Sequence, residues 1–418
     1  MRSPTANPGI RLAEVMAALS IATDLGMGQP LESALRSCVA AVRLGEALGF
    51  DDDALRDVYY LSLLRYIGCN AETQALAALF GDELALRRDF AAVDPGDPVE
   101  VVRLAAAHIR RAHASEPPDR LEALVANALH DLPRAMHETF AGHCEVAQRL
   151  AARLGLPDSL IVCLGQLYER WDGKGQPRGL KGEAVAPAVL VVTLAQDALV
   201  WTRIGGIEAA MAMARERSGG AYQPGMAARF CERAPFILAG LDEEPSWAAV
   251  LAMEPGAPPM LSNEAFDRCC EALADFADIK SPYTLGHSPG VASLAAGAGR
   301  RCGLIEVDVS ALHRAALLHD LGRVGVSAGL WGKAGPLSER EWEQVRLHPY
   351  YTERILARSA ALERLGAIAS LHHERLDGSG YHRGALGPSL SVPARVLAAA
   401  DAYHAMTEPR PHRPARTP

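Results

Sequence analysis

The chain has 418 residues, which suggests two domains at roughly 100–200 residues each. Hydrophobic residues make up 49% and charged residues 22%, which is ordinary for a globular protein and excludes wholesale disorder. The net charge of −8 argues against a nucleic-acid-binding face over the whole chain. No stretch reaches the ~18 uninterrupted apolar residues that span a bilayer, and the N-terminus lacks a secretory apolar core. We therefore expect a cytoplasmic protein without a membrane segment or nucleic-acid-binding module.

Apolar residues spaced by three and four predict helices along the chain. We expect helices within residues 31–48, 55–67, 146–154, 291–302 and 309–318. Alternating strand patterns are scarce, and aromatic residues make up only 6% of the chain, which favours helices over sheets. The predicted fold class is all-α.

An internal repeat runs through both halves of the sequence. YERWDGKGQPRGLKG at residues 168–182 matches HERLDGSGYHRGALG at residues 373–387. In the same order, LSLLRYIG at residues 61–68 matches AALLHDLG at residues 315–322. Two ordered matches indicate a duplicated helical domain.

A Pro-rich segment marks the boundary between the two copies. Residues 254–260 read EPGAPPM and cannot continue a helix. We predict a first helical-bundle domain at residues 9–253, a linker at 254–260 and a second domain at 261–418.

Histidine is concentrated in the second copy, which holds 9 of the 14 His residues between positions 287 and 412. There, polar side chains interrupt apolar helices in AALLHDLG and LAAADAYH, and burying them unpaired would cost roughly a few kcal/mol each. Bound divalent cations would resolve that cost, and imidazole with carboxylate is the donor set of Fe, Mn, Zn or Ni rather than Ca. The expected ligands are His287, His319, Asp320, His348, His372, His373 and Asp401.

This donor set favours a two-metal phosphohydrolase. Asp320 has two oxygens and follows a ligand His, so it can bridge two ions. Two ions about 3.5–4 Å apart clamp a bridging hydroxide and polarise a phosphoryl group. Arg323 lies one turn further on and would stabilise the equatorial oxygens, so Asp320 and Arg323 are the expected catalytic residues. One shell would be His287, His319 and Asp401, and the other His348, His372 and His373.

The motifs HDLGRVG, LHPYYTERIL, HHERLDGSGY and DAYHAMTEPRPHR resemble the HD-GYP family of the HD phosphohydrolase superfamily. The resemblance covers about residues 265–414 and includes SPYTLGHS. It implies an all-helical fold, a di-metal site and phosphodiesterase activity on cyclic di-GMP, and we expect a homodimer and a signalling-protein partner. The expected substrate-binding residues are Tyr283, Arg323, Arg375, Tyr381, Arg410 and Arg413.

Several positions depart from the family pattern. The GYP triplet reads GYH at residues 380–382, and Arg323 replaces the usual Lys. Tyr283 stands where some members have a Glu that recruits a third metal, so we expect two ions. The chain ends soon after RPHR at residues 410–413, and we expect a bundle shortened at its C-terminal end. The arginines of RPHR would bind phosphate or form a solvated basic end.

The first copy keeps the scaffold and loses the ligands. Arg65-Tyr66 stand opposite His319-Asp320, and only His143 keeps a ligand type, so we expect no metal there. Its role stays open between a structural or dimerising partner and a sensory or nucleotide-binding module. Other lost ligand positions are occupied by Ser33, Leu167, Tyr168 and Gln196.

The leading interpretation is a metal-dependent phosphodiesterase acting on cyclic di-GMP, with a degenerate regulatory first domain. One alternative is a non-enzymatic, nucleotide-responsive regulator with weak or no turnover, which the altered GYP triplet favours. Another is an HD phosphohydrolase that acts on a different nucleotide.

Overall fold

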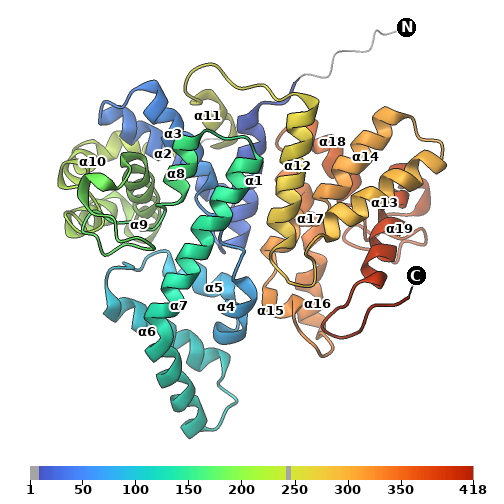
Figure 1. Cartoon of the computed structure of the whole chain (residues 1–418), viewed down its shortest axis with the longest axis horizontal. Coiled ribbons are helices and arrows are strands. Elements are labelled where there is room, and N and C mark those ends of the chain that lie inside the picture. The colour runs from blue at the N-terminus through green and yellow to red at the C-terminus, as the bar shows by residue number, and fades with distance from the viewer. Residues whose placement is uncertain (1–8, 242–245, 418) are drawn as a thin grey trace. The chain divides into compact units, whose positions relative to one another are not determined.

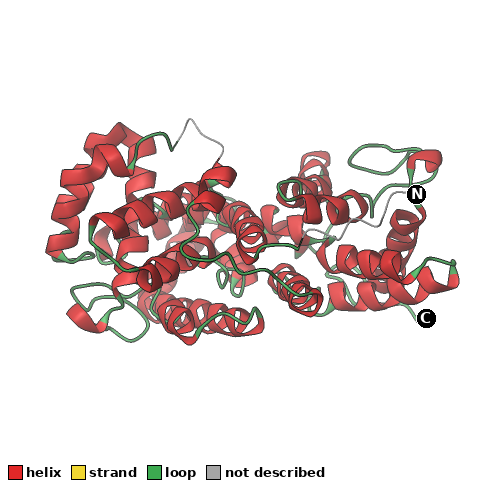
Figure 2. Cartoon of the chain, turned by 90° about the horizontal axis from the view of Figure 1, so that it is seen from above, coloured by secondary structure: helices red, strands yellow, loops and turns green. Residues whose placement is uncertain are grey.

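The computed structural model describes residues 9–241 and 246–417 (Figure 1). Over these ranges the regular structure is helical, with isolated β-bridges and no strand (Figure 2). The all-α prediction is confirmed.

Contacts divide the described residues into two compact units. The C-terminal unit combines the residues up to Ala18, Pro258–Val326 and the chain from Leu330 onward; the N-terminal unit combines Leu19–Ala257 with Ser327–Gly329. This division differs from the predicted boundaries at the start of the chain. The reason is a short antiparallel pairing, in which Leu12 N–H donates to the Pro259 carbonyl and Leu261 N–H to the Ile10 carbonyl, both at 2.9 Å. The functional boundaries stay a prediction.

The N-terminal unit has a helical core built on three packed helices. Its elements are the end of α1 (Leu12–Gly26), α2 (Ser33–Ala47), α3 (Asp52–Leu64), α4 (Thr73–Phe80), α5 (Glu83–Phe90), α6 (Pro98–Ala112), α7 (Pro118–Arg153), α8 (Asp158–Leu164), a 3₁₀ turn η1 (Gly182–Ala184), α9 (Pro187–Glu216), α10 (Pro224–Ile237) and α11 (Ser246–Ala252). α2 packs against α3 and α9 and buries Leu35, Leu61 and Leu194 between them. Asp51 and Asp82 begin α3 and α5 because their carboxylates accept first-turn backbone N–H groups.

α9 is the one helix in the described chain that is long and apolar enough to cross a membrane by length and composition. Of its most apolar window, 56% is buried inside the structure. Gly205 and Gly206 also interrupt its helical geometry. A core helix passes the same test, so α9 is weak evidence for a membrane, and the predicted absence of a span stays a prediction.

The C-terminal unit surrounds α13 and α14. Its elements are α12 (Asn263–Asp278), α13 (His287–Arg301), α14 (Glu306–Leu318), a 3₁₀ turn η2 (Leu321–Gly325), part of α15 (Ala328–Trp331), α16 (Glu339–Arg346), α17 (His348–Leu356), α18 (Ala360–Ala369), a 3₁₀ turn η3 (Gly387–Ser389) and α19 (Val392–Thr407). α13 packs on α14 and α19, with Leu312 and Leu397 fully buried. Ser338 begins α16 through a capping box with Glu341.

The predicted helices match the structure best where the apolar spacing is regular. Residues 31–48, 291–302 and 309–318 correspond to α2, α13 and α14 within four residues at each end. The prediction of 146–154 captured only the end of α7, which has 36 residues and contains Pro133. The first half of α7 has apolar spacing of the same kind, at Leu121, Val125, Ala128 and Leu132, and the prediction missed it.

The repeated loop has the same hydrogen bonds in both units. A buried glutamate, Glu169 or Glu374, accepts the backbone N–H groups nine and eleven residues later, at 2.7 and 2.8 Å. A Cβ at Gly175 or Gly380 would lie within 2.6 Å of backbone atoms of the loop's first three residues. The sequence match therefore reflects one loop structure formed twice.

A second match is the close approach of a glycine to a helix. A Cβ at Gly68 would lie 1.9 Å from the carbonyl oxygen of His143, and one at Gly322 would lie 2.0 Å from that of His348. In both units a side chain at this position would overlap the backbone of the facing helix. Only glycine therefore allows the turn after α3 or α14 to contact that helix without displacement.

Candidate metal centre

The His-Asp turn at the end of α14 is fixed to α17 by one buried hydroxyl. Thr352 Oγ1 accepts the Gly322 N–H and donates to the His319 carbonyl oxygen, both at 2.9 Å. Thr352 is fully buried, so these two backbone groups have no access to water there. The hydroxyl thus sets where His319 and Asp320 lie relative to His348, the first residue of α17.

Three imidazoles are oriented by their own helices. In His319, His348 and His372, Nδ1 lies 2.6–2.7 Å from the backbone carbonyl oxygen three residues earlier. Because a carbonyl only accepts, Nδ1 carries the proton and Nε2 keeps its lone pair. Each ring therefore presents a ligand nitrogen to the centre of the unit.

Asp320 lies between two groups of imidazoles. Its Oδ1 is 3.5 Å from Nε2 of both His348 and His372. Its Oδ2 is 3.6 Å from Nε2 of His319 and 4.0 Å from Nε2 of His287. The two carboxylate oxygens thus face different sets of nitrogens.

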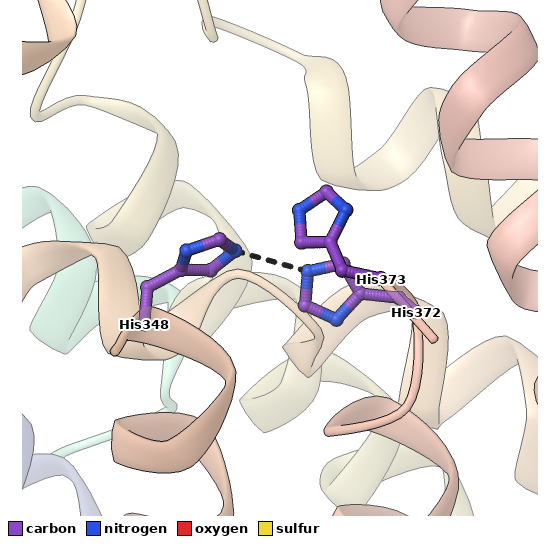
Figure 3. A group of neighbouring side chains, drawn as sticks. All are labelled: His348, His372 and His373. Carbon is purple, nitrogen blue, oxygen red and sulfur yellow. Dashed lines mark hydrogen bonds between the residues drawn. The ribbon is translucent and has the colours of Figure 1, made fainter. Parts of the chain in front are cut away.

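The seven predicted ligands come together as these sets. In Figure 3, His348 and His372 turn ring nitrogens toward each other beside His373, and their Nε2 atoms are 3.1 Å apart. Groups whose donor atoms lie within 4.8 Å of one another are His348, His372 and His373; His287, His319 and Asp401; and His319, Asp320 and His372. The structure places the residues together, and their assignment as ligands remains a proposal.

The local electrostatics keep His319, His348 and Asp320 in metal-binding protonation states. Burial lowers the pKa of His319 to about 4 and that of His348 to about 3, so both are neutral at pH 7. Burial alone would raise the pKa of Asp320, but the positive charge of Arg323 and its histidine neighbours hold it well below its usual range. Neutral imidazoles around a carboxylate are a donor set for divalent ions.

The surroundings of His319 Nε2 indicate whether a metal ion fits among these residues. His319 Nε2 is buried and has no hydrogen-bond partner among the described residues. Its separations from the carboxylates of Asp320 and Asp401, 3.6 and 3.8 Å, exceed a hydrogen bond. Two ligands about 2.1 Å from a shared ion lie roughly 3–3.5 Å apart, close to these separations. The residues present therefore fit divalent ions.

The predicted substrate contacts divide into two groups. Arg323 donates to Asp320 Oδ2 at 2.9 Å and lies 4.0 Å from the Trp331 ring centroid, and Tyr381 stacks on His373 with ring centroids 4.7 Å apart. These two lie beside the candidate ligands.

The other four predicted contacts differ in position. Arg410 donates to Glu408 at 2.8 Å and to the Tyr283 carbonyl at 2.7 Å, which links the residue after α19 to the loop before α13. Arg375 is exposed. Arg413 donates to backbone carbonyls around the end of α19, and these bonds occupy its guanidinium.

Sequence reasoning missed an outer carboxylate. Glu408 Oε2 lies 2.8 Å from His287 Nδ1, while His287 Nε2 lies 3.1 Å from Asp401. Burial would lower the pKa of His287, but these carboxylates outweigh it and raise the pKa to about 9. His404 completes this outer group, with Nδ1 3.2 Å from His287 Nδ1. The signal was the i, i+4 spacing of His404 and Glu408 within DAYHAMTEP.

The corresponding region of the N-terminal unit holds different chemistry. Tyr66 and Gln196 are hydrogen-bonded to each other there. His143 Nε2 lies 2.9 Å from Glu72, and its Nδ1 lies 3.1 Å from the Tyr168 hydroxyl. The side chains at the positions that match the candidate ligands thus bond among themselves.

The chain was compared with known proteins. A family model described as an HD domain matches residues 271–418. Over 97% of this chain and 88% of the relative, the sequence is 30% identical to the 3′3′-cGAMP-specific phosphodiesterase 3 of Vibrio cholerae. It is 36% identical to a cyclic di-GMP phosphodiesterase of Thermotoga maritima, over 34% of this chain and 39% of that protein. The chain belongs to the HD-GYP family of HD-domain phosphodiesterases.

A solved structure agrees with this assignment. The crystal structure of a cyclic GMP-AMP-specific phosphodiesterase from V. cholerae covers 96% of this chain with a TM-score of 0.65 and 26% identity, and 89% of that chain is matched. The likeness extends through both units, whereas the Thermotoga relative matches about a third of this chain.

Proposed function

We propose that this protein is a metal-dependent phosphodiesterase that hydrolyses a cyclic dinucleotide in its C-terminal unit. The position of Asp320 carries the proposal, because its two oxygens face separate groups of imidazoles. His287, His319 and Asp401 would hold one ion, and His348, His372 and His373 the other, with Asp320 shared.

The donor set suits Fe, Mn, Zn or Ni. When bound, such ions would lower the pKa of a water molecule between them and polarise the phosphoryl group. The chain's own residues supply the rest. The carbonyl-oriented rings hold the donor atoms in place, and Arg323 donates to the phosphoryl oxygens as negative charge develops on them. Trp331 restricts Arg323 by packing against its guanidinium.

Substrate positioning is assigned to the residues around the centre. Tyr381, stacked on His373, offers a ring edge to a base or ribose. Arg410, which donates a hydrogen bond to Glu408, would contact a phosphate of the substrate. Tyr283 and Arg375 are exposed enough to reach substrate from solvent.

Two cyclic dinucleotides are candidates. The relative that matches nearly the whole chain carries the name of a 3′3′-cGAMP-specific enzyme, which favours 3′3′-cGAMP. Relatives named for cyclic di-GMP match 34–37% of this chain. Turnover of both compounds, measured side by side, decides between them.

The N-terminal unit is proposed to be a degenerate HD-type domain with a regulatory or dimerising role. The shared loop hydrogen bonds at Glu169 and Glu374 support a common origin. The side chains that replace the ligands support the loss of metal chemistry.

The test pairs metal analysis with turnover. Purified full-length protein is analysed for bound metal and assayed with 3′3′-cGAMP and cyclic di-GMP, beside Asp320→Asn and the control Asp308→Asn on the exposed face of α14. We expect about two ions per chain and turnover in the wild type and the control, with both lost in Asp320→Asn.

Two outcomes would contradict the proposal. Bound metal without turnover of either dinucleotide would favour the non-enzymatic regulator, or, if another phosphoester is cleaved, a different phosphohydrolase. Equal metal content and turnover in Asp320→Asn would show that the carboxylate is not a shared ligand.

A further inference from the structure

The N-terminal unit contains a cavity of about 890 Å³. This volume lies within the range of roughly 300–1,000 Å³ that is usual for small-molecule sites. Its wall includes Arg65, Tyr66, Tyr168 and Gln196, which stand at or beside former ligand positions in the repeat. The cavity therefore occupies the place that the metal centre has in the other copy.

Most of the wall is apolar. Helices α4, α6 and α7 pack on one another and form a small hydrophobic cluster around Phe80, Ile109 and Val125. Most of its partly buried members line the cavity. They include Leu76, Leu79, Leu124, Ala128, Leu129 and Leu132. An apolar surface of this extent inside a folded unit favours an apolar occupant.

The polar end of the cavity has one buried hydrogen-bond donor without a partner among the described residues. Arg65 Nη1 donates to Thr193 Oγ1 at 2.9 Å, while Arg65 Nε is buried and has no hydrogen-bond partner within the described residues. A buried guanidinium N–H without a partner is costly, and an anion next to it removes that cost.

Lys174 on the wall is exposed to solvent, and the other charged groups there are already engaged. Arg170 pairs with Asp94 and Asp172, and Arg217 with Asp197. Arg87 donates to two backbone carbonyl oxygens. The remaining carboxylates have partners as well: Glu72 has His143, Glu169 has the loop N–H groups, and Asp131 and Glu138 have Arg134.

We propose that this cavity binds an amphipathic carboxylic acid, with its carboxylate on Arg65 and its apolar body against α4, α6 and α7. One free donor and apolar walls suit a single negative charge on a long apolar chain. A cyclic dinucleotide has two phosphates and polar bases, and it would leave several of these groups without partners. The loss of metal ligands thus left a charged end that recognises an anion without reacting with it.

The proposal does not depend on the catalytic assignment, so its test uses binding alone. Dodecanoate, octanoate and dodecanol, each below its micelle concentration, are titrated calorimetrically into metal-free full-length protein. Dodecanoate is expected to bind, and dodecanol at least tenfold more weakly because it lacks the charge. Each buried methylene tightens binding about three- to fourfold, so octanoate should bind on the order of 100-fold more weakly.

Four variants locate the site. Arg65→Met should weaken dodecanoate to the level of dodecanol, and Arg65→Lys should keep most of the affinity. The matched control Arg149→Met, on the exposed face of α7 and away from the cavity wall, should bind like the wild type. Ala128→Trp fills the cavity from α7 and should abolish binding of both dodecanoate and dodecanol.

The outcomes are decisive in both directions. No dodecanoate binding by the wild type, or equal binding by Arg65→Met when its circular dichroism is native, overturns the proposal. Binding of cyclic di-GMP or 3′3′-cGAMP that Arg65→Met or Ala128→Trp removes would identify a nucleotide site instead and would also overturn it. Loss of turnover through Asp320→Asn leaves the result for this cavity unaffected.

Discussion

Gly322 lies where the turn that contains His319 and Asp320 contacts α17. The substitution Gly322→Ala tests how much this close contact contributes to the stability of the unit and to its metal affinity. The added Cβ would lie 2.0 Å from the His348 carbonyl oxygen and 2.5 Å from the Thr352 nitrogen. Both are backbone atoms, so no side chain can rotate away. Carbon–oxygen contacts are ordinarily no shorter than about 3.3 Å, and α17 must therefore move by more than ~1 Å.

The expected cost follows from this overlap. Inserting a methyl group into packed structure costs typically 1–3 kcal/mol, and a backbone clash belongs at the upper end, so we expect about 3 kcal/mol. That corresponds to a melting temperature lower by roughly 6–12 °C for a unit of this size. Because His348 begins α17, its ring moves away from His372, and metal affinity should fall about 10- to 100-fold.

Substitution of a second glycine, Gly297, should change the stability in the opposite direction. Gly297 is exposed in α13, and a Cβ there would meet nothing within 4 Å. Gly297→Ala should therefore stabilise the helix by about 0.5–1 kcal/mol. Scanning calorimetry of the full chain, following the transition that added metal shifts, measures both variants. A melting temperature for Gly322→Ala equal to that of the wild type or of Gly297→Ala would refute the close approach.

Three further substitutions test other contacts. Thr352→Val leaves a buried N–H and a buried carbonyl without partners and should destabilise the metal-binding unit by about 2 kcal/mol in calorimetry, whereas Thr352→Ser should recover most of it. Glu374→Gln removes one of two acceptors for its loop, so limited proteolysis should cut there faster and turnover should fall. Burial would raise the pKa of Cys69, but the charge and hydrogen bond of His143 lower it, so its thiolate forms at lower pH. His143→Gln should therefore slow iodoacetamide labelling of Cys69 at pH 7 by about tenfold by peptide mass spectrometry, with exposed Cys302 unchanged; an equal rate would contradict the pairing.

The sequence predicted the parts of this protein that depend on local pattern. The helical class followed from apolar spacing, and the family followed from ordered motifs such as HDLGRVG. Some candidate ligands could be named because a polar side chain follows an apolar run, as Asp401 does after Ala398, Ala399 and Ala400, and the others because they lie in the ordered motifs of the family.

The supporting contacts could not be predicted because they join residues far apart in sequence. Thr352 lies 33 residues from the His319 carbonyl that it holds, and Glu408 lies 121 residues from His287. A threonine in YTER has no pattern that distinguishes it from a surface threonine. The cavity beside Arg65 was also invisible, because it is formed where helices α4, α6 and α7 fail to fill space.

If the two copies arose by the proposed duplication, the glutamate-anchored loop allows scaffold and chemistry to diverge independently. Its fold depends on one carboxylate, two backbone N–H groups and a glycine, none of which donates to the metal centre. Drift could therefore replace His372 and His373 by Leu167 and Tyr168 in the other copy while the loop kept its shape. Under the proposed duplication, one copy would lose its ligands while this loop kept its hydrogen bonds, and the interior that the ligands had occupied would be free to acquire a new binding specificity.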